Sequence, residues 1–274
     1  MKIEIIASID GYLKENIKKE LSKKYYRFLK RQEAHFYVNN EEVNTAHNVK
    51  SGDKIIISFN DFTQKDEILY DHPLDILYMN DDFMVVNKES GLNTIPSKSE
   101  PVKSLYNAVY TYLKKLGRLE TIHIITRLDK DTSGLVLIAL NKKAALIMNK
   151  NHYEMNKLYY AKVKGELESH FIVEKPIKRV KNSTLREVNP SGQYAKSEFF
   201  NEGYKNGYTI IKVKLYTGRT HQIRVHLKSI GYPIINDKLY GYGDGNLGLH
   251  ACFLSFTFNN KTWTFESNPE WLDN

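Results

Sequence analysis

A succession of short β-prone runs, interrupted by only a few helical segments, sets the strongest limit on how this chain folds. The apolar run LVLIAL occupies residues 135–140, and apolar and polar residues alternate over residues 208–216. The segment ACFLSFTFNNKTWTF, residues 251–265, is again β-prone. Alternating runs favour half-buried strands. We therefore expect an α+β fold with a large, mixed but mostly antiparallel central sheet and flanking helices.

Three segments between these runs favour helices. SLYNAVYTYLKKLGRL (104–119) is amphipathic and ends near Gly117, and KKAALIMNKNHYEM (142–155) follows the apolar run. Residues 220–230 form the third and stop at Gly231. Glycine after the last apolar turn is a common helix end. Further strands are expected at residues 76–78, 83–88 and 159–165.

Residues 1–60 differ from the rest in their sequence pattern and are expected to form a separate small α/β module. A Lys-rich stretch carries an apolar stripe at helical spacing, made of Leu13, Ile17, Leu21, Tyr25, Phe28 and Leu29. FYVNNEEVN then predicts a hairpin that turns at Asn39-Asn40, and residues 54–59 predict a strand. This order resembles the S4-like RNA-binding module; a small docking domain with a solvated basic face is the structural alternative. We assign 61–75 to a linker and 76–274 to a second, larger domain, which carries the motifs described below.

The charge balance favours a polyanionic partner. The chain has 40 Lys and Arg against 32 Asp and Glu, a net charge of +8. Cys252 is the only cysteine, so an intramolecular disulfide and a thiolate metal cluster are excluded. The N-terminus has early acids and a short apolar stretch, so it is no signal peptide, and no run of about 18 apolar residues spans a membrane. We expect a soluble cytoplasmic protein.

The stretch ITRLDKDTSG, residues 125–134, places two acids and two bases in five positions directly before the apolar run. Asp131 begins the sequence DTSG, whose side chains can bond nearby backbone amides, so we expect it to shape a turn. Asp129 has no such local role and lies between Arg127 and Lys130, which favour its ionised form. Of the two acids, Asp129 is therefore the candidate for chemistry.

Three motifs, in order, resemble the signature of the RluA-type pseudouridine synthases. RLDKDTSG (127–134) is the first, KLYYAKVKG (157–165) resembles the family strand K-x-Y-x-A-x-V-x-G, and TGRTHQIRVHLKSIGYPIINDKLYG (217–241) resembles the third. The opening strands ILYMNDDFMVVNKESGL match as well, and the resemblance covers roughly residues 68–265. It implies the pseudouridine synthase fold and an isomerase that turns uridine in RNA into pseudouridine without metal or organic cofactor.

The resemblance also implies residue roles. Asp129 corresponds to the catalytic nucleophile, Tyr159 to the tyrosine that stacks near the target base, and Arg224 to the arginine that pairs with the catalytic carboxylate. Arg127 corresponds to the arginine that occupies the space of the flipped nucleotide. The family usually has His before R-L-D, and this chain has Thr126, which we expect to affect substrate preference. The motifs also place four residues among those expected to bind RNA or assist base flipping: Lys88, Arg219, His221 and Gln222.

We expect the protein to be a monomer and its partner to be RNA. Ribosomal RNA is favoured over transfer RNA because of the S4-like module. Candidates for phosphate contacts are Lys98, Lys103, Lys178, Arg179, Lys181 and Arg186. His221 and His226 have no acidic or Cys partner that completes a metal site, so we expect a structural or phosphate-facing pair.

Two alternatives stay open at this point. A non-catalytic S4-type RNA-binding protein would share the basic charge, but it has no need for Asp129, Tyr159 and Arg224 together. A two-carboxylate glycoside hydrolase would need a second acid at a set separation. Asp131 has no clear claim to that role, and we expect Asp237 to anchor the loop after Tyr232-Pro233.

Overall fold

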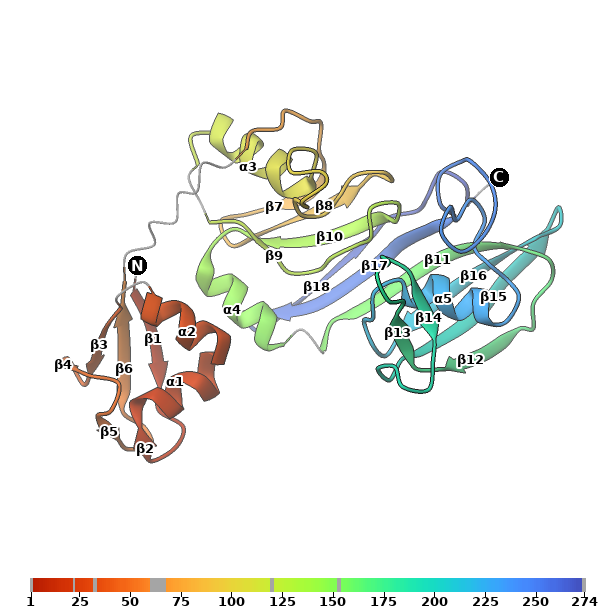
Figure 1. The fold of residues 1–274 in the computed structure, drawn as a ribbon. Coiled ribbons are helices and arrows are strands. Elements are labelled where there is room, and N and C mark those ends of the chain that lie inside the picture. The colour runs from red at the N-terminus through yellow and green to blue at the C-terminus, as the bar shows by residue number, and fades with distance from the viewer. Residues whose placement is uncertain are drawn as a thin grey trace. The chain divides into compact units, whose positions relative to one another are not determined.

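The computed structural model of the protein describes residues 2–21, 23–31, 34–59, 68–118, 121–151 and 154–272, and it describes the backbone alone at positions 24, 28 and 31. The chain divides into two compact units, Met1–Glu67 and Ile68–Asn274 (Figure 1). Among the described residues, no helix is long and apolar enough to cross a membrane.

The first unit packs two helices on a small antiparallel sheet. The sheet order is β1 (Lys2–Ile6), β6 (Lys54–Ser58), β3 (His35–Val38) and β4 (Glu41–Val43); β2 (Gly11–Tyr12) pairs with β5 (Asn48–Val49). The helices are α1 (Leu13–Leu21) and α2 (Lys23–Arg31). Leu13, Ile17 and Leu29 are fully buried against Ile55 and Ile57, so these members of the predicted apolar stripe form the core. The side chain of Phe28 lies outside the described residues.

The predicted hairpin is confirmed, and its turn has a local cause. Asn39 and Asn40 have φ angles of 49° and 74°, and they join β3 to β4. Two consecutive left-handed residues form the turn that matches the twist of an antiparallel pair, and Asn tolerates that conformation better than most side chains.

The second unit begins before residue 76. The predicted linker residues 61–67 lie outside the described residues. Residues 68–75, which we assigned to the linker, belong to the second unit. Tyr70 and Leu74 pack against its core, and the Tyr70 amide donates to Thr111 Oγ1 at 2.8 Å.

A ten-stranded sheet forms the second unit. Eight of its strands lie in the order β12 (His170–Glu174), β15 (Lys196–Lys205), β16 (Tyr208–Leu215), β11 (Asn156–Lys164), β17 (Leu249–Phe258), β10 (Ser133–Ala139), β8 (Phe83–Lys88) and β7 (Asp75–Met79). β18 (Lys261–Glu266) pairs with β17, and β9 (His123–Ile124) pairs with β10. Among the described strands of this sheet, β10 and β17 are the one parallel pair, so the predicted mostly antiparallel sheet is confirmed. A separate hairpin joins β13 (Ile177–Arg179) and β14 (Arg186–Val188).

The parallel pairing requires a glycine at the end of the charged loop. Gly134 has a φ of +113°, and a Cβ at this position would collide with the backbone of Ala251. The loop can therefore approach β17 closely only because residue 134 lacks a side chain.

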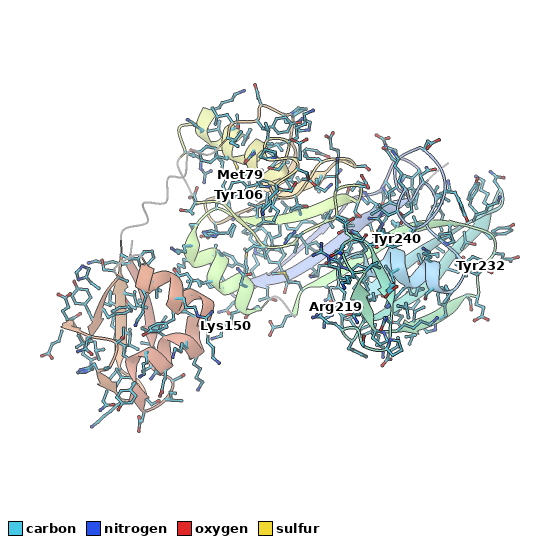
Figure 2. The ribbon with its side chains drawn as sticks, in the orientation of Figure 1. Met79, Tyr106, Lys150, Arg219, Tyr232 and Tyr240 are labelled. Atoms are coloured by element: carbon cyan, nitrogen blue, oxygen red, sulfur yellow. The ribbon has the colours of Figure 1, made fainter. Side chains whose placement is uncertain are left out.

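The two faces of the sheet pack against different helices. α3 (Leu105–Lys115) and α5 (Gln222–Ser229) contribute to the larger core on one face, and α4 (Lys142–Lys150) packs on the other face against β8, β10 and β17 (Figure 1). Tyr106 on α3 and Met79 on β7 both pack against the larger core (Figure 2). Ser104 caps α3 by accepting the Asn107 amide.

Two predicted helices are shorter than the sequence suggests. α5 starts at Gln222 rather than residue 220, because His221 adopts a left-handed conformation with φ of 58°. α4 ends at Lys150, with Asn151 as its C-cap. The predicted positions 152 and 153 lie outside the described residues.

Candidate active site

The charged loop between β9 and β10 is fixed by hydrogen bonds from its own Thr126 and from Thr94 of another loop. The Thr126 hydroxyl accepts the Leu137 amide of β10 at 2.8 Å and is buried. The Thr94 hydroxyl donates to the Leu128 carbonyl at 2.7 Å and accepts the Leu128 amide at 3.2 Å. Thr126, the residue that departs from the family pattern, therefore fastens this loop to the central sheet.

Lys88, at the end of β8, also holds the charged loop. Its ammonium donates to the carbonyls of Glu89, Leu92 and Lys130 at 2.7, 2.8 and 3.0 Å, which uses all three donors. Burial lowers the pKa of Lys88 to about 8, although the nearby charges of Asp131 and Asp129 raise it. We predicted that Lys88 contacts RNA, but its side chain is 1% exposed and joins two loops.

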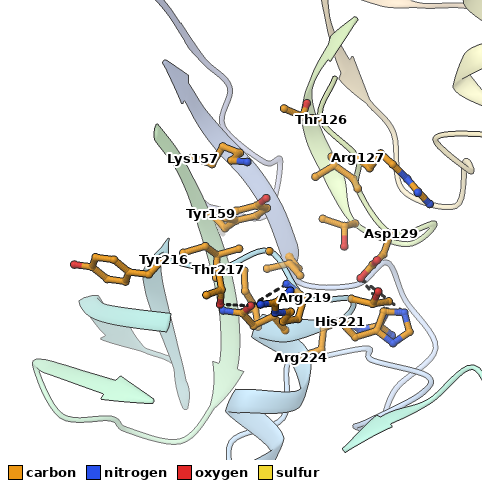
Figure 3. A pocket seen from close by; sticks show the side chains of 18 of the residues that line it. Thr126, Arg127, Asp129, Lys157, Tyr159, Tyr216, Thr217, Arg219, His221 and Arg224 are labelled. Atoms are coloured by element: carbon orange, nitrogen blue, oxygen red, sulfur yellow. Dashed lines mark hydrogen bonds and ion pairs between the residues drawn. The ribbon is translucent and has the colours of Figure 1, made fainter. Parts of the chain in front are cut away.

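The two acids of the loop are placed differently. Asp129 lines a cavity of about 540 Å³, and the cavity lining among the described residues does not include Asp131. The carbonyl of Asp129 accepts the Thr132 amide at 3.2 Å, and the carbonyl of Asp131 accepts the Ser90 hydroxyl at 2.6 Å. Asp131 thus lies within the turn, and the Asp129 carboxylate faces the cavity (Figure 3).

Arg224 lies beneath Asp129 but is held mainly by another acid. Its Nε and Nη2 donate to Asp237 Oδ2 and Oδ1 at 2.8 and 2.7 Å, and its Nη1 lies 3.8 Å from Asp129 Oδ2. Arg224 is 2% exposed and Asp237 is fully buried. Burial raises the pKa of Asp237, but the hydrogen bonds and charge of Arg224 outweigh this and lower it. Such a fork fixes the guanidinium, so that its third nitrogen is aimed at Asp129.

Asp237 also anchors its own loop. Its Oδ1 accepts the amides of Leu239 and Tyr240, both at 3.0 Å. Asp237 therefore anchors its loop, as expected from the sequence. Its ion pair with Arg224 could not be predicted from its position in the sequence.

His221 approaches Asp129 from the start of α5. Its Nε2 lies 3.9 Å from Asp129 Oδ2, and its Nδ1 lies 2.7 Å from the Tyr240 hydroxyl. Because that hydroxyl accepts the Arg186 amide at 2.8 Å, its proton is free for Nδ1, which favours the neutral tautomer with a proton on Nε2. Burial lowers the pKa of His221, and the charge of Asp129 opposes this.

Tyr159 forms the opposite wall of the cavity, on β11 (Figure 3). Its side chain is buried, and burial together with the charge of Asp129 raises its pKa above the usual range. The phenol therefore keeps its proton near neutral pH. This suits a stacking or hydrogen-bonding partner better than a general base.

Gln222 shapes the loop between β16 and α5. Its Oε1 accepts from Thr217 Oγ1 and the Arg219 amide at 2.7 and 3.0 Å, and its Nε2 donates to the Lys196 carbonyl and Ser197 Oγ at 3.0 and 2.9 Å. We predicted an RNA contact for Gln222; its amide lies at the cavity wall but is engaged with the protein.

The exposed arginines border the cavity. Arg127 extends from the charged loop with its guanidinium directed away from Tyr159 (Figure 3), and Arg219 donates from Nε to the Tyr194 carbonyl at 2.9 Å. A second cavity, of about 400 Å³, shares the wall of residues 218–220 with the first. It is lined by three of the predicted phosphate contacts, Lys178, Arg179 and Arg186. Among the others, Lys98, Lys103 and Lys181 are exposed.

Lys157 was not predicted as a site residue. It lines the cavity, and burial lowers its pKa. It stands two residues before Tyr159 on β11, so strand alternation was a usable signal for it. His226, by contrast, is a buried residue of α5 between Ser197 Oγ and the Lys175 carbonyl, and is a structural histidine rather than a phosphate contact.

A carboxylate beside a buried arginine, in a cavity of ligand size rimmed by cations, is the arrangement expected of an active site for an anionic substrate. Residues 82–229 match the family model of RNA pseudouridylate synthase, and the chain belongs to this family. An uncharacterized RNA pseudouridine synthase of Bacillus subtilis (strain 168), YjbO, is 35% identical over 80% of each chain. A ribosomal large subunit pseudouridine synthase D of Xylella fastidiosa is 35% identical over 64% of this chain and 54% of its own length.

A solved structure shows the same fold. Human RNA pseudouridylate synthase domain containing 1 has a TM-score of 0.63 and 23% identity, with 73% of this chain and 85% of that one covered. The predicted family, the α+β fold class and the enzyme class, an RNA-modifying isomerase, are confirmed. The alternative of a non-catalytic RNA-binding protein finds no support in these comparisons.

Proposed function

We propose that this protein converts particular uridines of structured RNA to pseudouridine, with Asp129 as the nucleophile. One observation carries the proposal: the Asp129 carboxylate faces a cavity in which Arg224 Nη1 and His221 Nε2 lie 3.8 and 3.9 Å away. Both groups stabilise an anion there, and neither is close enough to neutralise it by a short hydrogen bond.

The reaction breaks the N1–C1′ bond of uridine and joins C5 to C1′, with no change of oxidation state. As the nucleophile, Asp129 attacks the nucleoside; in the alternative route its carboxylate removes a proton from the sugar. Tyr159 stacks on the base as a protonated phenol. After C5 of the base bonds to C1′, the proton on C5 leaves to solvent or to a nearby acceptor, and N1 takes up a proton.

The target uridine must leave its helix to reach Asp129, at a cost of a few kcal/mol. Contacts to the phosphates offset it, and the second cavity with Lys178, Arg179 and Arg186 lies next to the first. We propose that Arg127, which lines the first cavity, turns into the space that the base vacates. The first unit is proposed as an S4-like RNA-binding module. Lys88 is proposed to position the charged loop, and Gln222 to position the loop between β16 and α5.

Ribosomal RNA is the favoured substrate, because several relatives are named ribosomal large subunit pseudouridine synthase D. A monomer in the cytoplasm remains the expected state.

The test incubates the purified full chain with transcribed, unmodified ribosomal RNA and, separately, transfer RNA, and maps pseudouridine at single-nucleotide resolution. We expect a small number of sites, in ribosomal RNA. Pseudouridine on neither RNA would contradict the proposed activity, and sites confined to transfer RNA would contradict the substrate preference alone.

A further inference from the structure

The second unit carries a patch of tyrosines and lysines on one face of its sheet, in which Tyr208 and Tyr216 are exposed and the other members are partly exposed. Along β11 and β16, Ala161, Val163, Ile211 and Val213 point into the larger core. The alternate residues point to the other face. The tyrosines and lysines among them, together with Lys196 of β15 and with Tyr216 directly after β16, form what we name the Tyr–Lys face: Tyr160, Lys162, Lys196, Tyr208, Lys212, Lys214 and Tyr216.

The helices of this unit leave the Tyr–Lys face open. Among the described residues, α3 and α5 pack on the opposite face of the sheet, and α4 packs against β8, β10 and β17. Tyr216 is 51% exposed and Tyr208 is 37% exposed. Large aromatic side chains at such exposure form a surface that is available to a partner.

Each ring of this face lies next to an ammonium group. Lys212 lies 5.4 Å from the ring centre of Tyr160, and Lys162 lies 5.5 Å from that of Tyr208. Tyr216 has two such neighbours, Lys196 at 5.3 Å and Lys214 at 5.1 Å. Aromatic rings stack on nucleobases, and lysines bind the phosphates between them, so this combination fits a single-stranded nucleic acid.

Tyr216 connects the Tyr–Lys face to the catalytic cavity. It lines the cavity rim, and its ring points away from Asp129 and Tyr159 (Figure 3). Its hydroxyl donates to Glu198 Oε2 at 2.7 Å, and His170 Nε2 lies 3.0 Å from the other oxygen of Glu198. The ring orientation is thus fixed while its surface stays exposed.

The charges on this face favour a polyanion over a second copy of the chain. Three acids lie among the lysines: Glu198 is committed to Tyr216 and His170, Glu174 pairs with Lys196 at 3.5 Å, and the charge of Glu202 acts on Lys212. A symmetric dimer through this face would bring the same lysines against one another, which is unfavourable. A phosphate backbone has the complementary charge.

We propose that the Tyr–Lys face binds the single-stranded segment of RNA next to the target uridine, with Tyr216 stacked on a nucleobase at the rim of the catalytic cavity. This inference rests on the proposed function. It adds a second binding surface, separate from the cavity lined by Lys178, Arg179 and Arg186.

The experiment measures binding of two fluorescent RNA stem–loops with the same loop uridine. One ends at the stem, and the other carries single-stranded flanks of about eight nucleotides on both sides, within the length that such surfaces cover. We expect the flanks to tighten binding to the wild type by about tenfold or more, in the range of one stacked base plus lysine contacts.

Two variants should remove this gain. In Tyr216→Ala the flanks should lose most of their effect, whereas Tyr216→Phe, which keeps the ring, should retain most of it. In the double variant Lys212→Gln/Lys214→Gln, the slope of log Kd against log salt for the flanked RNA should fall by about 1.4, or 0.7 per lysine on single strands. The matched control is Lys261→Gln, an exposed lysine 4.0 Å from the ring of Trp263, which should keep the full gain.

The proposal is overturned if Tyr216→Ala and the double lysine variant keep the wild-type gain from the flanks. It is also overturned if both weaken the flanked and unflanked RNAs equally, because the residues would then act inside the cavity. Sedimentation that shows a dimer disrupted by these variants would assign the face to a second copy instead. Since binding is measured without turnover, a wild type that binds but makes no pseudouridine would refute the proposed function separately.

Discussion

The buried pair of Arg224 and Asp237 gives the most quantitative test of the site. In Asp237→Asn, the guanidinium loses one charged partner of a two-bond fork while it remains 2% exposed. Removal of one partner of a buried ion pair destabilises a protein by about 3–5 kcal/mol, because the remaining charge stays desolvated. We therefore expect the unfolding free energy of the second unit to fall by about that amount.

The assay is urea denaturation followed by tryptophan fluorescence. Both tryptophans, Trp263 and Trp271, lie in the second unit, so the signal reports the unit that contains the pair. The matched control is Asp71→Asn. Its partner Lys115 lies at 2.7 Å, but the two side chains are 77% and 59% exposed, and such pairs contribute less than about 1 kcal/mol.

Activity should fall as well, because the fork that aims Arg224 Nη1 at Asp129 is lost. Asp237→Asn should lower the single-turnover rate more than it weakens RNA binding, since Asp237 is fully buried and cannot touch RNA. An unfolding free energy within 1 kcal/mol of the Asp71→Asn control would refute the reasoning that this pair holds the site together.

Three further outcomes follow from the site. Thr126→Val keeps the shape of the side chain but removes the acceptor of the buried Leu137 amide, so stability should fall by about 1–3 kcal/mol in urea melts; an unchanged melt would contradict the anchoring role. Tyr159→Phe should bind RNA like the wild type but turn over more slowly in single-turnover assays, and equal rates would show that the hydroxyl is idle. Burial lowers the pKa of His250 from 6.5 to about 4, so the free energy of unfolding should fall by up to about 3 kcal/mol as the pH is lowered from 6.5 to 4. His250→Gln should flatten that pH dependence.

The sign for His250 follows from proton binding. Between pH 6.5 and 4 the unfolded chain takes up a proton on this side chain and the folded chain does not. Acid therefore favours unfolding in this window. His226, which is buried, and His221, which is partly buried, also have lowered pKa values and act in the same direction.

Most of the fold could be predicted because its signals are local. Strand alternation placed β8, β11 and β16 within a few residues, and Asn39-Asn40 placed the first hairpin. The start of α5 was misplaced because the left-handed His221 is held by Tyr240, a contact across 19 residues that no local pattern shows.

The sequence predicted which residues form the site better than it predicted the hydrogen bonds and ion pairs that hold them. The motifs brought Asp129, Tyr159, His221 and Arg224 to one cavity, as the structure places them. They gave no sign that Arg224 is shared with Asp237, since a buried ion pair is decided by tertiary packing. They also gave no way to tell a lysine that faces solvent from Lys88, whose ammonium is used by three carbonyls.

The role of Asp129 is tested most directly by the single-turnover rate of Asp129→Asn beside Asp131→Asn, on an RNA that the wild type modifies. Asparagine keeps the shape of both side chains and removes the negative charge. We expect Asp129→Asn to bind this RNA but form no pseudouridine above background, and Asp131→Asn, outside the cavity lining, to keep most of the wild-type rate. Pseudouridine formed by Asp129→Asn at the wild-type rate, or its loss only in Asp131→Asn, would contradict the assignment of Asp129 as the reactive carboxylate.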